Sequence, residues 1–133
     1  MKDYQIEKEI IQSFIRKNKQ ERLLYELTKP DKRSKGLDRF AHQAQDLLYP
    51  DKISLKGCDL TKQDEFRRFL EQHEENCHII SNDPKLDRQY LPLSEAIIQA
   101  DYSFEAVLIK GKDFLLVFSE AEKGGRMKYL LCR

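Results

Sequence analysis

The stretch FEAVLIKGKDFLLVFSEAEKGGRMKYLLC, residues 104–132, holds three runs rich in β-branched, leucine and aromatic residues. The runs cover residues 104–110, 113–119 and 126–132, and the short segments GK and AEKGG separate them. Apolar runs of this length joined by short turns predict an antiparallel meander of three strands. The middle run, DFLLVFS, is apolar almost throughout, which predicts a strand covered on both faces of the sheet.

The chain before this meander has mainly helical periodicity, because its apolar residues recur at intervals of three and four. The predicted helices cover residues 3–28, 36–48, 62–75 and 92–100. The first is either one helix or two, 3–16 and 19–28, since the polar run RKNKQER interrupts its apolar face. A further short strand is expected at CHIIS (77–81), and KISLKG (52–57) is either a short strand or simply an extended segment.

These elements predict an α+β fold, with N-terminal helices packed on a mostly antiparallel sheet whose C-terminal part is the three-stranded meander. A chain of 133 residues fits one domain, residues 1–133. Two helix starts carry capping pairs, Asn18 with Glu21 and Thr61 with Asp64.

The composition argues against several classes of protein. Charged residues make up 35% of the chain, yet the net charge is +1, so no overall field attracts nucleic acid or a membrane. The N-terminus is charged throughout, unlike a signal peptide, and the longest apolar run, FLLVF, is far shorter than the roughly 20 residues of a membrane span. Three cysteines without a Cys-x-x-Cys pair favour a reducing compartment, so we expect a cytoplasmic protein without membrane contact.

The charges are distributed unevenly along the chain. Residues 16–39 hold nine Lys or Arg against four Asp or Glu, whereas residues 59–75 hold six acids against three bases. A solvated surface that balances itself is the simplest interpretation. The alternative is a basic patch that binds a phosphate or an acidic partner.

The helix LDRFAHQAQDLL, residues 37–48, carries the predicted catalytic candidates. Its apolar residues share one stripe, and Arg39, His42 and Asp46 lie opposite that stripe. His42 and Asp46 are four residues apart, so they can hydrogen-bond, and a carboxylate that orients an imidazole is half of a general-base device. The alternatives are an exposed histidine beside a helical acid, and a covered polar face that fixes packing.

The loop KPDKRSKG, residues 29–36, carries the predicted anion-binding residues. Lys32, Arg33 and Lys35 could neutralise the phosphates of a nucleic acid or bind another anion. Aromatic residues do not interleave with these cations, so the sequence does not predict base stacking.

Part of a zinc-site spacing is present in Cys58, His73, Cys77 and His78. The matching Cys-x-x-Cys half is missing, and structural zinc normally takes four ligands. We therefore predict no metal site and no cofactor.

Two other patterns favour turns over chemistry. Asp83-Pro84-Lys85 has the Asp-x-Lys shape of a metal-dependent nuclease motif, but Asn-Asp-Pro is typical of a turn. Gly124-Gly125 lacks the surroundings of a phosphate-binding loop and fits the turn between the last two strands of the meander.

The absence of a catalytic signature and the two charge-polarised segments favour a small protein-binding or regulatory module, of the immunity-protein kind, without catalysis. Its partner would then be another protein. One alternative is a nucleic-acid-associated protein that uses residues 29–39. Another is a hydrolase-type enzyme with His42 and Asp46 in a cleft. The sequence leaves the oligomeric state open.

Overall fold

A computed structural model describes residues 3–121 and 125–133. Its α-helices are α1 (Asp3–Phe14), α2 (Lys17–Thr28), α3 (Arg33–Leu47), α4 (Asp64–Gln72) and α5 (Leu93–Tyr102). One-turn 3₁₀ helices lie at Pro50–Lys52 and Leu60–Lys62. Its strands are β1 (Ile53–Gly57), β2 (Asn76–Ser81), β3 (Tyr90–Pro92), β4 (Val107–Lys110), β5 (Phe114–Phe118) and β6 (Lys128–Cys132).

The strands form one sheet in the order β1-β6-β5-β4-β2-β3, and every neighbouring pair is antiparallel. Strands β4, β5 and β6 are adjacent in chain order, which confirms the predicted C-terminal meander. The turn AEKGG between β5 and β6 includes residues 122–124, so the predicted Gly124-Gly125 turn lies partly outside the described residues. The predicted α+β class, with helices preceding an antiparallel sheet, is confirmed.

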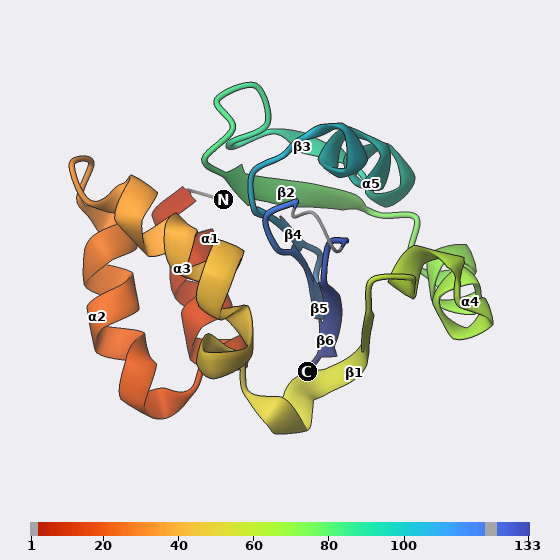
Figure 1. Cartoon of the computed structure of the whole chain (residues 1–133), viewed down its shortest axis with the longest axis horizontal. Coiled ribbons are helices and arrows are strands. Elements are labelled where there is room, and N and C mark those ends of the chain that lie inside the picture. The colour runs from red at the N-terminus through yellow and green to blue at the C-terminus, as the bar shows by residue number, and fades with distance from the viewer. Residues whose placement is uncertain (1–2, 122–124) are drawn as a thin grey trace.

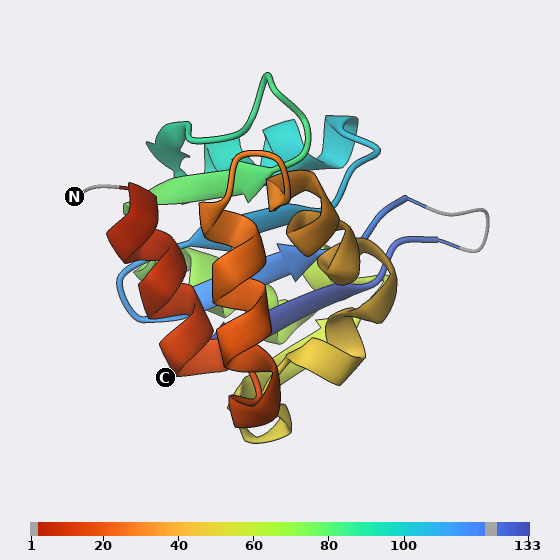
Figure 2. The ribbon, with the colours of Figure 1, turned by 90° about the vertical axis from the view of Figure 1, so that its left-hand side faces the viewer.

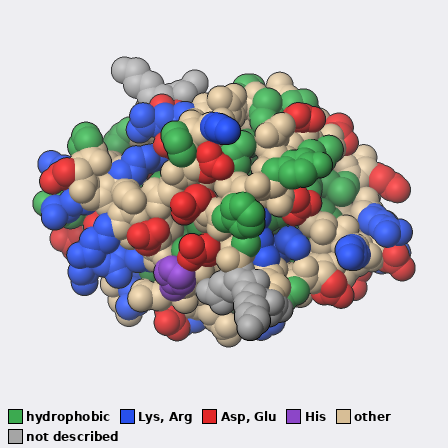
Figure 3. All heavy atoms as spheres, turned by 45° about the horizontal axis from the view of Figure 1, so that its top comes forward, with side chains coloured by type: hydrophobic (Ala, Val, Ile, Leu, Met, Phe, Trp, Pro, Cys, Tyr) green, Lys and Arg blue, Asp and Glu red, His purple; other side chains and the backbone are tan. Residues whose placement is uncertain are grey.

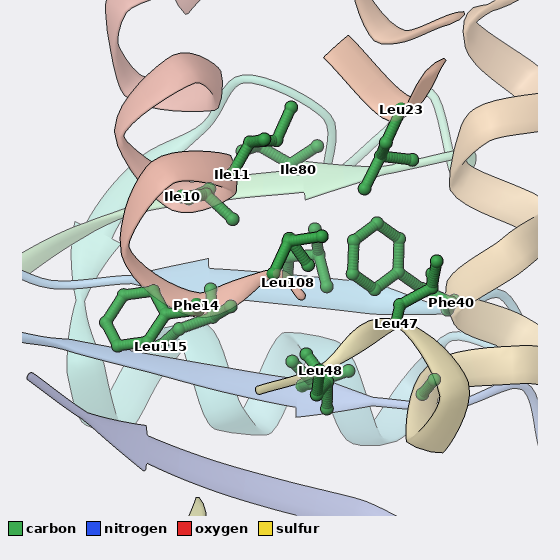
Figure 4. Packing of buried hydrophobic residues seen from close by; sticks show 14 of the residues in the cluster. Ile10, Ile11, Phe14, Leu23, Phe40, Leu47, Leu48, Ile80, Leu108 and Leu115 are labelled. Carbon is green, nitrogen blue, oxygen red and sulfur yellow. The ribbon is translucent and has the colours of Figure 1, made fainter. Parts of the chain in front are cut away.

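Helices cover both faces of the sheet (Figure 1). Helices α1, α2 and α3 lie together in front of one face, as the turned view shows (Figure 2), while α4 and α5 pack on the other. Buried side chains from the first three helices meet the sheet between the layers, with Phe14 and Phe40 beside Leu108 and Leu115 (Figure 4). Phe66 of α4 belongs to the second core, on the opposite face.

Strand β5 explains why its sequence is apolar throughout. Leu115 and Val117 face the core under α1–α3, and Leu116 and Phe118 face the core under α4 and α5. All its residues are buried. The prediction of a strand covered on both faces is therefore confirmed.

The predicted helical region 3–28 forms two helices, α1 and α2, which was one of the two alternatives. The chain breaks between them because Ile15 forms an isolated β-bridge with Leu48, just after α3. The backbone N–H of Arg16 also donates to the carbonyl of Leu47 (2.8 Å). The capping prediction for Asn18 is wrong, since α2 begins at Lys17 with Arg16 at the N-cap.

Other boundaries differ from the sequence prediction in places where tertiary contacts act. Helix α3 starts three residues early, at Arg33, and its backbone leaves helical geometry at Gln43 (φ −129°, ψ 23°). Gln63, and not Thr61, takes the N-cap position of α4. Strand β3 was not predicted; it is a three-residue edge strand that forms by pairing with β2.

Candidate functional site

Arg39, on the polar side of α3, is held by a buried carboxylate on α2. Its Nε and Nη2 donate to the two oxygens of Glu26 at 2.6 and 2.9 Å. This bidentate contact holds the pKa of the Glu26 carboxyl below its usual range, although burial opposes the shift. Arg39 therefore joins α2 to α3 instead of standing free on the helix surface.

His42 is paired with an acid from the sheet side of the molecule. Its Nε2 lies 2.9 Å from Oε2 of Glu120, which follows β5, and its side chain is 57% exposed. The non-helical residue Gln43 lies between His42 and Asp46. His42 and Asp46 both line a cleft of about 480 Å³ between α3 and the β5–β6 end of the sheet. The structure thus brings the two predicted residues to one cleft and places Glu120, which the sequence did not indicate, beside the His42 ring.

In the basic segment 29–39, the side chain of Arg33 is used inside the protein, as that of Arg39 is. Arg33 Nη2 donates to Asp87 Oδ1 at 2.9 Å, and Nη1 contacts the carboxylate of Glu7 on α1. Glu7 is only 3% exposed, and burial raises the pKa of its carboxyl despite the neighbouring guanidinium. Lys32 and Lys35 are exposed to solvent. Of the three predicted anion ligands, two therefore remain at the surface and one bridges elements of the fold.

A cationic cleft between α2 and α3 brings the predicted candidates Arg39 and Asp46 together with cations of α2 that carried no predicted role. Its volume is about 460 Å³, and Arg16, Lys19, Arg22 and Arg39 line it together with Asp46. Lys and Arg side chains also gather at the surface over α2, at the left of Figure 3. The local excess of positive charge in residues 16–39 was the only sequence signal for this cleft.

Exposed apolar side chains lie at the C-terminal end of α5 and in the segment that follows it. Tyr102 is 82% exposed, Phe104 80% and Ile98 50%. We name these three residues the α5 patch. Exposed hydrophobic side chains are visible over α5 in Figure 3. Aromatic residues next to a turn are a weak signal in a sequence, so the patch was not predicted.

The α5 patch is mounted on a fixed segment of backbone. Arg126, just before β6, donates from Nη1 to the carbonyls of Ala100 (2.6 Å) and Ser103 (2.9 Å). Its Nη2 contacts the carbonyl of Glu105. One guanidinium therefore binds both sides of Tyr102 and Phe104, from a distant part of the chain.

A row of polar side chains crosses the sheet under α1. His78 of β2 is paired with Lys110 of β4 on one side and with Tyr90 of β3 on the other. The rings of His78 and Tyr90 are 4.4 Å apart. These residues line a cavity of about 350 Å³ together with Glu9. Burial lowers the pKa of both Lys110 and His78.

Lys110 is engaged with neighbouring groups in this cavity. Its Nζ contacts the carbonyl of Gly111, lies 3.2 Å from that of Lys112, and is 3.8 Å from Glu9 Oε1. These contacts hold the ammonium over the turn between β4 and β5. We therefore assign Lys110 to the closure of this turn.

The residues of the partial zinc spacing have packing roles in the fold. His73 stacks on Phe69, with ring centroids 4.2 Å apart, and Cys77 is buried in the second core. Within residues 3–121 and 125–133, no group of three or more His, Cys, Asp or Glu side chains is arranged to hold a metal ion. The turn interpretation of NDPK is supported, because Asp83 Oδ1 accepts the backbone N–H of Lys85 at 3.0 Å.

Comparisons with protein-family models, with curated proteins and with solved structures found no match for this chain. None of the helices in the described residues has the length and apolar composition needed to cross a membrane.

Proposed function

We propose that this protein is a small interaction module, without catalysis, that binds another protein through the α5 patch. The observation that carries the proposal is the exposure of Tyr102 and Phe104, about four fifths of each residue. Exposed apolar clusters with polar surroundings mark interaction surfaces in folded proteins. Tyrosine is enriched among the residues that contribute most binding energy at such surfaces.

The rigid mounting of the patch supports the same proposal. Arg126 ties Ala100, Ser103 and Glu105 together by their carbonyls. A further hydrogen bond, from Ser103 Oγ to Asp83 Oδ2 (2.9 Å), fixes the same segment to the loop after β2. A surface that is already ordered loses less conformational entropy on binding, so its aromatic side chains contribute more of their contact energy to affinity.

The charges around the patch favour a basic partner. Glu95 and Asp101 are exposed on α5, and the half-buried Glu105 follows Phe104. Acidic residues around an apolar centre attract a surface that places Lys or Arg around its own apolar side chains. The partner that fits is a protein segment with one or two apolar anchors flanked by basic residues.

Site-specific photocrosslinking tests this proposal in the cells that make the protein. A benzoylphenylalanine at position 102 is expected to form a covalent adduct with one protein, and the same probe at the exposed Tyr49 is not. Equal adducts at both positions, or adducts at position 49 alone, would show that the α5 patch is not the binding surface.

The compartment we propose for this function is the cytoplasm, where cysteines such as the three free ones here stay reduced. The nucleic-acid alternative, at residues 29–39, and the hydrolase alternative, at His42 and Asp46, stay predictions. A wild-type protein that binds neither DNA nor RNA at low salt would remove the first. An alanine at His42 that leaves any detected activity unchanged would remove the second.

A further inference from the structure

We propose that the cleft between α2 and α3 binds a small phosphate ester whose organic part carries hydroxyl groups. The cleft is lined by residues of α2 and α3 and shares none with the α5 patch, so this inference does not rest on the proposed function. Its volume of about 460 Å³ falls in the range of small-molecule sites. Four cationic side chains and one carboxylate line it.

Two of the cations are held in position by groups outside the cleft. Arg16 donates from Nε to the carbonyl of Leu48 and from Nη2 to that of Gln45, both at 3.1 Å. Arg39 donates from Nε and Nη2 to Glu26. A guanidinium carries five N–H donors, and these contacts use two of each group's five. The remaining donors belong to side chains that are already ordered, which favours binding of an anion.

The other two cations supply the charge. The Glu26 carboxylate neutralises the charge of Arg39. Arg22, whose side chain is largely exposed, has its Nε 3.7 Å from Glu26 Oε2. Lys19 is exposed one helical turn before Arg22. With Arg16 added and Asp46 subtracted, the cleft keeps an excess of about two positive charges. That excess matches the charge of a phosphate monoester near neutral pH.

The guanidinium groups favour phosphate as the anionic group. Their planar donors bind the oxygens of phosphate in pairs, which a lysine ammonium cannot do. The α2–α3 cleft combines both kinds of cation, since arginine guanidinium groups and a lysine ammonium line it.

Asp46 and the amides of Asn18 and Gln43 suit the organic part of the ligand. A carboxylate among cations repels a bare anion but accepts hydrogen bonds from hydroxyl groups. Gln43 lines the cleft and is the residue at which the α3 backbone leaves helical geometry. The combination favours a phosphorylated polyol or sugar over inorganic phosphate.

Isothermal titration of the full chain at low salt with ribose 5-phosphate, inorganic phosphate and ribose tests the proposal. Ribose 5-phosphate is expected to bind most tightly, inorganic phosphate about tenfold or more weakly, and ribose not measurably. Absence of ribose 5-phosphate binding at millimolar concentration, or equal affinity for it and inorganic phosphate, would overturn the proposal.

A matched pair of double variants locates the binding. Lys19→Gln with Arg22→Gln removes two exposed cations of the cleft and is expected to weaken ribose 5-phosphate binding about tenfold or more. Lys62→Gln with Arg68→Gln removes the same two residue types near α4 and should leave affinity unchanged. Equal losses in both double variants would assign the binding to overall charge and refute the site.

Asp46→Asn separates the two halves of the ligand. Removal of the negative charge is expected to strengthen the binding of inorganic phosphate. It should also reduce the preference for ribose 5-phosphate over inorganic phosphate, because an asparagine accepts hydrogen bonds from hydroxyl groups less well than a carboxylate does. An unchanged preference contradicts the role of Asp46. A short single-stranded oligonucleotide that binds the cleft more tightly than ribose 5-phosphate would overturn the small ligand and assign the cleft to nucleic acid.

Discussion

Arg33 Nη2 lies 2.9 Å from Asp87 Oδ1, which joins the start of α3 to the loop between β2 and β3. The same guanidinium contacts Glu7 of α1, whose carboxylate is buried. Three segments that are far apart in the sequence therefore meet at one cation. The basic segment 29–39 thus contributes to the fold as well as to the surface.

Arg33→Ala is expected to destabilise the protein by about 3 kcal/mol, because it leaves the buried Glu7 carboxylate without its partner. Urea unfolding at pH 7 measures the change. Lys32→Ala is the control, since Lys32 is exposed beside Arg33, and it should change the free energy of unfolding by less than about 0.5 kcal/mol. Similar effects of the two substitutions would refute the bridging role.

The stability lost in Arg33→Ala should depend on pH. Burial raises the pKa of the Glu7 carboxyl in the folded protein above its value in the unfolded chain. The folded protein therefore favours the protonated carboxyl, and this contribution to stability is complete at a pH below the unfolded-state pKa. It is lost as the pH rises through the folded-state pKa. Without Arg33 the pKa rises further. The destabilisation should therefore be largest at neutral pH and smaller at pH 4, whereas a loss that is constant across this range contradicts the assignment.

Arg126→Ala is expected to destabilise the protein by about 2 kcal/mol, because the carbonyls of Ala100, Ser103 and Glu105 lose their donor. Hydrogen exchange of the amides around Phe104 should accelerate more than exchange in β5. If both regions accelerate equally, Arg126 supports the whole fold and does not specifically order the α5 patch.

Gly111→Ala is expected to destabilise the protein by about 1–3 kcal/mol. Gly111 lies in the β4–β5 turn, and a Cβ there would overlap the ring of Phe114 at the start of β5. Thermal unfolding with Lys112→Ala as the neighbouring control checks this. A Gly111→Ala protein as stable as the control would show that the ring moves freely, contrary to its burial.

Thiol labelling should distinguish the cysteines. Burial raises the pKa of Cys77 to about 12, so its thiolate is scarce at pH 8, whereas Cys58 is exposed. Mass spectrometry after brief iodoacetamide treatment is expected to find Cys58 modified and Cys77 unmodified until denaturant is added. Early modification of Cys77 in the native protein would contradict its position in the core.

Much of the fold follows from local sequence patterns. The apolar run of β5 and the stripe of α3 are each contained in one segment, and periodicity alone identifies them. Strand β3 could not be predicted this way, because its three residues adopt strand geometry only by pairing with β2. The cap of α4 was misplaced because a one-turn 3₁₀ helix, Leu60–Lys62, takes up the residues before it.

The candidate site was predicted less completely, because its decisive contacts join distant residues. The sequence places Arg33 in a basic run and predicts an anion ligand, but its contacts with Glu7 and Asp87 come from distant segments that no local pattern reveals. Helical spacing predicts Asp46 as a neighbour of His42, whereas Glu120, just after β5, approaches the ring from a distant part of the chain that spacing does not reveal. Exposure of Tyr102 and Phe104 depends on how α5 packs, which no local pattern contains.

The most direct test of the proposed function is selection of a random peptide library on the wild-type protein, with counter-selection on Tyr102→Ser with Phe104→Ser. Both side chains are largely exposed, so this double variant should keep its stability within about 0.5 kcal/mol. Tyr25→Ser with Tyr49→Ser, which removes exposed tyrosines elsewhere, is the control. We predict peptides with apolar anchors flanked by Lys or Arg that bind the wild type and the control but not the patch variant. Peptides that bind all three proteins equally, acid-rich peptides, or failure to obtain any peptide that discriminates the patch variant would contradict the proposal.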